Sequence, residues 1–440
     1  MEGYNYLLSL CVILMSTKIF SILSRRAQMP QVVGALMAGL FFGPAVLGAV
    51  TNHFFGVQIC LMPSEFLSRI AALGVIVIMF TAGMETNVEE LKASGFSGFI
   101  VALLGVALPL GMGTGMMYFF NPDVDFHSAI FVGAILTATS VSITVEALKE
   151  LGKMSTKVGN TILAAALIDD ILGLICLTIV TGIAGGDTNL LMVFVKILGF
   201  FVFIVITGYV YNKYMMWSDR IQESRNLRRY PVMGFALCLF MAWAAEVVFG
   251  VADIIGAFAA GMIIAMSPKG QYIASKFDTI AYLLLTPVFF ANIGLEVTLP
   301  EFSSSVVIFT VVLVIVSIVS KLFGCGLGAF VCGFDKRQSY QVGLGMVCRG
   351  EVALIVANKG VAMNLVEESE LGPIIIMIII CTIITPVLLK GAFKGGNDAV
   401  GTTVFEDKYM LEEQADEIEE DLYQRRNKLN RQMYGLYGED

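Results

Sequence analysis

Two adjacent carboxylates, Asp169 and Asp170, stand inside an otherwise apolar run that reads "AALIDDILGL" over residues 165–174. Two carboxyl groups this close in a poorly solvated place cannot both ionise easily, so at least one should hold a proton near neutral pH. A cation that enters the site would displace that proton. The pair could therefore bind a cation and a proton in exchange for each other.

The elements that hold this pair belong to a membrane protein. Of the 440 residues, 57% are hydrophobic and 15% are charged, and the mean hydropathy is +0.80. An ionised Asp at the centre of a membrane helix costs about 2.5 to 3.5 kcal/mol, so the pair needs a partner or a function. Apolar stretches of about 17 to 25 residues suit helices that cross about 30 Å of hydrocarbon. We therefore predict an all-α polytopic protein with about thirteen transmembrane helices, over residues 4–23, 30–48, 66–84, 98–120, 127–148, 158–183, 189–212, 231–248, 251–267, 278–297, 304–331, 340–363 and 372–391.

Lysines and arginines collect in alternate loops. Clusters such as Arg25 with Arg26 and Lys336 with Arg337 alternate with loops, including 120–126 and 298–303, that contain neither residue. Because cytoplasmic loops keep the positive charges, we expect a multi-pass protein of the cell membrane with its N-terminus outside and its C-terminus in the cytoplasm. The net charge of −8 indicates no nucleic-acid partner. Eight scattered cysteines without a CxxC motif support neither a disulfide framework nor a zinc site, and we expect no cofactor.

An internal repeat divides the chain into two halves. "VVGALMAGL" at 32–40 matches "IIGAFAAGM" at 254–262, and "AGMETNVEEL" at 82–91 matches "IGLEVTLPEF" at 293–302, with Glu85 opposite Glu296. The counterparts are offset by seven predicted helices along the chain, and because seven is odd the two halves should be inverted. Inverted repeats are typical of secondary transporters, whose substrate sites lie near the membrane midplane on interrupted helices.

The repeat pairs the predicted helix 127–148 with 340–363, and both contain an unusually polar or glycine-rich segment. The first holds Thr137, Thr139 and Ser140, and the second holds Arg349 and Glu351. Unwound backbone in such segments exposes carbonyls, and the hydroxyls add oxygen ligands that suit a hard monovalent cation. The alternative for the hydroxyls is a continuous helix in which they bond back to its own carbonyls.

Four further charged residues have two readings each. Arg349 and Glu351 either form an internal salt bridge that supports the crossing of the interrupted helices or bind the ion directly. Glu246 and Asp253 flank the short link between the helices 231–248 and 251–267, and we interpret them as solvated loop acids; an ion funnel is the alternative.

Lys321 is the only cation well inside the predicted helix 304–331. A buried ammonium needs a carboxylate, so we expect Lys321 to lie beside an acidic side chain of another helix. The alternative is a lysine whose side chain reaches the cytoplasmic surface.

The sequence resembles the monovalent cation:proton antiporters of the Kef-like and NapA-like branch from about residue 25 to residue 390. The motifs that carry the resemblance are "MPQVVGALMAGLFFGP" at 29–44, "FTAGMETNVEELK" at 80–92, "TATSVSI" at 137–143, "LIDDILGL" at 167–174, "GAFAAGM" at 256–262 and "CRGEVALIVA" at 348–357. By the resemblance, Asp170 matches the carboxylate that carries the cation and the proton. Asp169 matches a preceding acidic position that is Asn in many electroneutral relatives, and Lys321 matches a buried lysine that pairs with this acidic residue in electrogenic members. The resemblance therefore implies a salt bridge between Asp169 and Lys321 when no cation is bound.

The resemblance also implies an NhaA/NapA-like antiporter fold with two crossed interrupted helices, in a homodimer with a mobile core. Mapped by order, residues 1–86 and 230–297 would form the dimerisation domain, 98–183 and 303–392 the core, and 188–229 a linker helix with a cytoplasmic loop. Residues 393–440 form a predicted amphipathic cytoplasmic tail. The tail either is free in solution or docks on the partner protomer.

These observations predict a transporter and not an enzyme. We expect exchange of a monovalent cation, Na⁺ first, for protons by elevator-type alternating access, with a role in pH homeostasis. Two protons for each cation would make the exchange electrogenic. The alternatives are a K⁺/H⁺ antiporter, or a Kef-type K⁺ efflux system without its nucleotide-binding domain, because no GxGxxG follows a strand in the tail. A receptor built on a transporter scaffold is disfavoured because the Asp, Lys and Ser/Thr set is complete.

Overall fold

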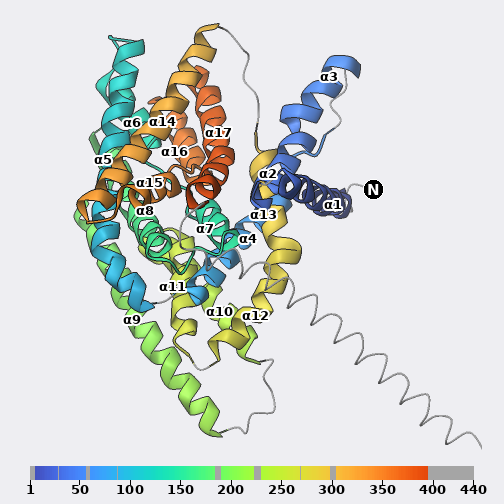
Figure 1. Cartoon of the computed structure of the whole chain (residues 1–440), viewed down its shortest axis with the longest axis vertical. Coiled ribbons are helices and arrows are strands. Elements are labelled where there is room, and N and C mark those ends of the chain that lie inside the picture. The colour runs from blue at the N-terminus through green and yellow to red at the C-terminus, as the bar shows by residue number, and fades with distance from the viewer. Residues whose placement is uncertain are drawn as a thin grey trace, which may run out of the picture.

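The computed structural model describes residues 5–27, 29–55, 60–86, 88–183, 190–221, 229–267, 269–297 and 304–394, and all regular elements within these ranges are helices. The predicted tail beyond Lys394 lies outside the described residues. In chain order (Figure 1), the first half contains α1 (Asn5–Arg26), α2 (Gln31–Phe42), η2 (Pro44–Gly48), α3 (Ala49–Phe55), α4 (Glu65–Glu85), α5 (Val88–Phe120), α6 (Phe126–Ile135), α7 (Val141–Glu150) and α8 (Lys157–Ile183). The second half contains α9 (Leu190–Ile221), α10 (Arg229–Trp243), η3 (Ala244–Phe249), α11 (Asp253–Ala265), α12 (Gly270–Ile280), η4 (Ala281–Leu285), α13 (Thr286–Leu295), α14 (Ser304–Val331), α15 (Lys336–Gly345), α16 (Glu351–Ala362) and α17 (Glu368–Phe393).

Within the described ranges, ten helices are long and apolar enough to cross a membrane. Three predicted spans differ from these ten: 127–148 is broken into α6 and α7, 340–363 is broken into α15 and α16, and 251–267 is the short α11. The prediction of an all-α polytopic protein is confirmed. Several helices extend beyond their predicted spans: α9 ends nine residues later and α12 begins eight residues earlier than predicted. The largest difference is at α5, which begins at Val88, ten residues before the predicted start, and places Glu89 and Glu90 in its first turn, where acidic side chains are favourable.

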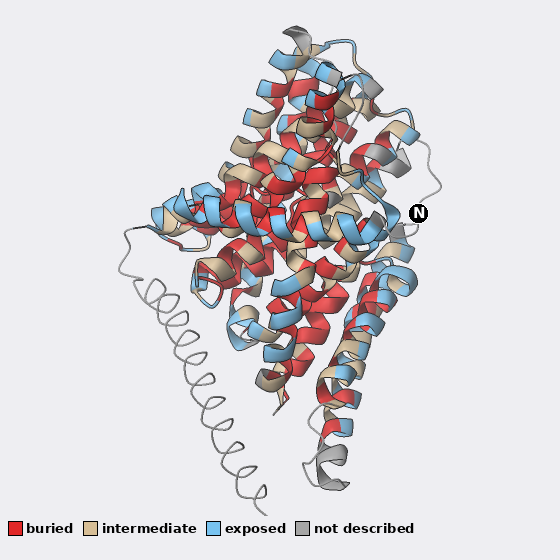
Figure 2. Ribbon diagram, turned by 90° about the vertical axis from the view of Figure 1, so that its right-hand side faces the viewer, coloured by how far each residue is buried: buried red, intermediate tan, exposed pale blue. Residues whose placement is uncertain are grey.

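The helices pack in two groups. In the first, α2 lies against α1 and α13, and α11 lies against α4 and α10; in the second, α5 lies against α6, α8 and α14, and α14 lies against α15 and α17. Figure 1 shows α5, α6, α14, α15, α16 and α17 gathered apart from α1, α2 and α13. Buried residues fill the interior and exposed residues mark the outer helices (Figure 2). The long α9 exposes many large apolar side chains, as expected for a helix that faces lipid.

Glycines at matching positions of the repeat let backbones approach closely in both halves. Gly34 and Gly39 on α2 correspond to Gly256 and Gly261 on α11. The first glycine of each pair faces the preceding helix, and the second faces a helix of the other half. An added Cβ would lie 2.5 Å from Phe20 O for Gly34, 2.3 Å from Met241 O for Gly256, 2.0 Å from Ala291 O for Gly39 and 2.2 Å from Phe80 O for Gly261. The sequence repeat is thus also a repeat of packing contacts.

Candidate functional site

Two helices are interrupted at the centre of the second group. Residues 136–140 separate α6 from α7, and residues 346–350 separate α15 from α16. The interruptions contact each other, because the Ser140 amide donates a hydrogen bond to the Cys348 carbonyl over 3.0 Å. The Thr144 hydroxyl donates to the Gly345 carbonyl over 2.9 Å. These are the two segments that the sequence predicts to be interrupted.

Arg349 joins the two interruptions to the surrounding helices. Its side chain is fully buried, and the guanidinium donates hydrogen bonds to the Ala138 carbonyl and, over 3.2 Å, to the Ser317 hydroxyl of α14. The Thr382 hydroxyl of α17 donates to the Arg349 carbonyl. Glu351 is the first residue of α16, but its side chain lies outside the described part, so the expected salt bridge with Arg349 stays a prediction. The described partners of the guanidinium are oxygens of uncharged groups.

Asp169 and Lys321 form a buried ion pair between α8 and α14. Lys321 Nζ lies 2.8 Å from Asp169 Oδ1 and 3.0 Å from Oδ2, and the side chains are 0% and 1% exposed. This is the pairing that the sequence predicts, and full burial excludes a lysine that reaches the surface. Gly105 of α5 makes room for the pair, since an added Cβ there would lie 3.6 Å from Lys321 Nζ and 2.5 Å from Cys325 Sγ.

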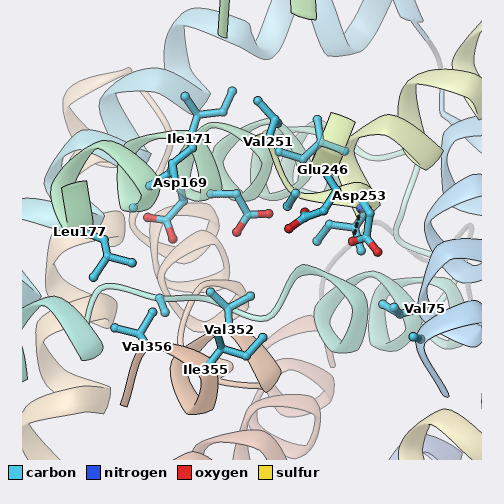
Figure 3. Close-up of a pocket in the computed structure, with 18 of the residues that line it drawn as sticks. Val75, Asp169, Ile171, Leu177, Glu246, Val251, Asp253, Val352, Ile355 and Val356 are labelled. Carbon is cyan, nitrogen blue, oxygen red and sulfur yellow. Dashed lines mark hydrogen bonds between the residues drawn. The ribbon is translucent and has the colours of Figure 1, made fainter. Parts of the chain in front are cut away.

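Asp170 lines a cavity of about 610 Å³ between the two groups of helices. Asp169 and Asp170 both line this cavity, but consecutive residues of an α-helix point about 100° apart, and Asp169 is buried against Lys321 whereas Asp170 is half-buried. The cavity is lined by α8, by the first interruption and by α16 from one group, and by α4, α11 and α13 from the other. Figure 3 shows Asp169 toward one end of it and Glu246 and Asp253 toward the other. Asp170 is thus one of the carboxylates on the cavity wall.

The three hydroxyl residues predicted to bind the ion differ in position. Thr137 lines the cavity with Asp170, and its hydroxyl donates to the Ala134 carbonyl over 2.7 Å. Thr139 is 1% exposed, and its Oγ1 has no hydrogen-bond partner among the described residues. The Ser140 hydroxyl lies 3.3 Å from that of Ser142. Only Thr137 shares the cavity wall with Asp170, while the other two are buried at the crossing.

Three acids and an amide from the first group also line the cavity: Glu246, Asp253, Glu296 and Asn292. From the sequence, Glu246 and Asp253 are interpreted as solvated loop acids. The structure places Glu246 in η3 and Asp253 as the first residue of α11, on the wall that faces Asp170. Asn292 and Glu296 are not among the site residues expected from the sequence, although the match of Glu85 with Glu296 in the repeat is a signal that could have identified the second.

Comparisons with known proteins found similar chains among cation/proton antiporters. The family model described as the transmembrane sodium/hydrogen exchanger matches residues 11–393. The chain is 37% identical over 401 residues to the Na(+)/H(+)-K(+) antiporter GerN of Bacillus cereus, an alignment that covers 90% of this chain and 98% of GerN. It is 35% identical over 388 residues to the Na(+)/H(+) antiporter of Enterococcus hirae, covering 87% and 96% of the two chains.

A solved structure supports the fold. The sodium proton antiporter MjNhaP1 from Methanocaldococcus jannaschii at pH 8 superposes with a TM-score of 0.64, covering 90% of this chain and 98% of MjNhaP1. At 16% sequence identity this likeness concerns the fold alone. The predicted antiporter fold is confirmed.

Proposed function

We propose, from the premise that this chain belongs to the sodium/hydrogen exchanger family, that it is a secondary antiporter that exchanges a monovalent cation for protons across a membrane. The observation that carries the proposal is the position of Asp170. This carboxylate lines a cavity beside the crossing of two interrupted helices, next to the buried Asp169–Lys321 pair. A carboxylate in such a place can hold either a cation or a proton, and competition between the two gives exchange.

We assign the shared site to Asp170, with Thr137 as the nearest hydroxyl ligand on the same wall. Thr139 and Ser140 support the site through the unwound backbone of the crossing, whose carbonyls suit a cation that has lost part of its water. Arg349 and Glu351 support the crossing. Asp169 and Lys321 are the proposed coupling pair: when the cation draws Asp169 away, the lysine can release a second proton.

We propose further that the two groups of helices move against each other as an elevator. The fixed group comprises residues 1–86 and 230–297 and forms the interface of a homodimer; the core comprises 98–183 and 303–392, and 188–229 links them. The cavity between the groups supports this division, because relative movement there would transfer Asp170 from one membrane face to the other. The distribution of Lys and Arg supports an outer N-terminus and a cytoplasmic C-terminus.

Na⁺ is the proposed cation, and the Kef/NapA-like branch is supported by the Asp–Asp motif together with Lys321. K⁺ is the second candidate, because the name of the relative GerN includes K⁺. A K⁺ efflux system would conduct without a proton gradient, whereas an antiporter requires proton countertransport.

Reconstitution into liposomes tests the proposal. With a pH gradient across the membrane and a pH-sensitive dye inside, the addition of Na⁺, Li⁺ or K⁺ in turn should move protons for at least one cation, with saturation. Empty liposomes are the control. Cation flux that dissipates no pH gradient would contradict antiport.

A further inference from the structure

One ion pair joins the proposed core to the proposed fixed domain at the membrane face away from the cavity. Lys149 Nζ of α7 lies 3.0 Å from Glu85 Oε1 of α4 and donates to the Thr81 hydroxyl over 3.3 Å. The cavity lining on α4 runs from Ser68 to Val75, and at 1.5 Å per residue Glu85 lies about 15 Å beyond Val75. The pair therefore joins the two groups of helices at the end of α4 away from the cavity.

The second half holds a comparable set of side chains on the cavity side, with an amide in place of the hydroxyl. The alignment that sets Glu85 opposite Glu296 also sets Thr81 opposite Asn292. Lys149 is the ninth residue of α7, which begins at Val141, and Lys359 is the ninth residue of α16, which begins at Glu351. The second half thus contains a lysine on its interrupted helix and a polar residue followed four positions later by Glu on α13.

In this structure Lys359 is apart from Asn292 and Glu296, and Asn292 Oδ1 lacks a donor. Asn292 Nδ2 donates to Glu296 Oε1 over 2.7 Å. Asn292 is 5% exposed, and its Oδ1 is buried without a hydrogen-bond partner in the described part of the chain. Lys359 is exposed, and neither it nor Glu296 forms an ion pair with a described residue.

Lys359 lies on the face of α16 that is directed toward Asn292 and Glu296. Val352, Ile355 and Val356 of α16 line the cavity, and Lys359 follows at a spacing of three and four residues, which continues the same face. Asn292 and Glu296 lie on the α13 wall of that cavity. Movement of α16 toward α13 would bring the ammonium to the carboxylate.

We propose that Lys359 pairs with Glu296 and donates to Asn292 Oδ1 when the cavity closes, as the counterpart of the Lys149–Glu85–Thr81 contact seen here. We call the Lys149–Glu85 and Lys359–Glu296 pairs the two lysine latches; they form alternately, and each closes one membrane face. The inference rests on the alternating access of the proposed function.

The Lys149 latch has a neighbouring contact that the Lys359 latch lacks. Glu150, next to Lys149, accepts hydrogen bonds from the backbone amides of Gln31 over 2.7 Å and Val32 over 3.0 Å at the start of α2. Its counterpart in α16 is Gly360, which has no side chain. The extra contact favours the cavity-open state, in agreement with the state observed.

Labelling of a cavity cysteine tests the latches. Ala72 lines the cavity and is exposed. The Ala72→Cys protein in lipid nanodiscs should therefore react with a bulky maleimide at residue 72 only while the cavity is open. Mass spectrometry of the peptide that contains residue 72 distinguishes this labelling from labelling of the native cysteines. Glu85→Gln removes the existing latch and should lower the labelling rate several-fold. Adding Lys359→Ala or Glu296→Gln should restore it, whereas Lys336→Ala, which removes an exposed lysine at the start of α15, should not.

An exchange of the two charges tests the pair itself. In the Glu85→Gln background, Lys359→Glu alone should raise labelling, and Lys359→Glu with Glu296→Lys should lower it again. If Glu85→Gln, Lys359→Ala and Glu296→Gln leave the labelling rate unchanged in variants that elute as folded protein, the inference is wrong. Cation/proton exchange by the Ala72→Cys protein in liposomes is measured in parallel, so that a missing exchange activity counts against the proposed function and not against the latches.

Discussion

At the residue scale, the adjacent carboxylates Asp169 and Asp170 differ in their contacts. Asp169 is bound on both oxygens by Lys321, so its charge is compensated inside the protein. Asp170 lines the cavity and is half-buried. We therefore propose Asp170, and not the Lys321-bound Asp169, as the carboxylate that the cation and the proton share.

Asp170→Asn should abolish exchange, because an amide neither releases a proton nor offers a charged oxygen to the cation. The variant should elute as the same folded species as wild type and move protons no faster than empty liposomes in the dye assay. Asp123→Asn, the same substitution in an exposed loop, is the matched control. Substantial turnover by the Asp170→Asn protein would refute its assignment as the shared site.

Asp169 and Lys321 should be strongly coupled in their effect on stability. Either Asp169→Asn or Lys321→Ala leaves one buried charge without its partner, at a cost of about 3 to 5 kcal/mol in the free energy of unfolding. The double variant leaves no charge, so its loss should be smaller than the sum of the single losses. Thermal unfolding in detergent measures all four proteins, and additive shifts would show that the pair is not energetically linked.

At the element scale, close helix contacts and two interruptions create the site. The interruptions leave backbone groups without helical partners, and Arg349 and Ser140 bind some of them across the crossing. Glycines at repeated positions bring α2 and α11 against their neighbours. These contacts hold the walls between which the cavity lies.

Gly261→Ala should destabilise the protein, because the new Cβ would lie 2.2 Å from Phe80 O and force α11 away from α4. Overpacking of this kind costs about 1 to 3 kcal/mol. Gly111→Ala on α5 is the matched control, since a Cβ there meets nothing within 4 Å and Ala favours the helix. We expect a lower unfolding temperature for the first variant only; equal behaviour of the two would mean that the contact tolerates a methyl group.

At the scale of the whole molecule, the proposed exchange moves charge across the membrane. Two protons for one cation transfer one net charge in each cycle, and each charge gains about 2.3 kcal/mol per 100 mV of membrane potential. The mobile group must carry Asp170 together with the Asp169–Lys321 pair for this coupling to operate.

Exchange of Na⁺ should therefore respond to a membrane potential imposed with K⁺ and valinomycin. Asp169→Asn should reduce the response, because the lysine then loses the carboxylate on which release of the second proton depends. Wild type and variant are compared at equal pH gradients. If their responses to the potential are the same, the pair does not set the stoichiometry, and Lys321 has a structural role only.

The sequence by itself determined the helices, the two interruptions and the need of Lys321 for a carboxylate. Hydrocarbon forces each spanning segment to be apolar and to satisfy its own backbone, so spans and interruptions are visible in the order of residues. Burial of a lysine likewise demands an opposite charge wherever the chain folds.

Only the tertiary structure decided which of the two carboxylates pairs with Lys321, that Glu246, Asn292 and Glu296 share the cavity wall, and that Arg349 binds backbone and hydroxyl oxygens. These relations depend on how helices distant in sequence rotate and approach one another. The rotation of each helix is set by its packing against neighbouring helices, including the close contacts at glycines. A sequence that is apolar on nearly every face of the helix does not encode that rotation.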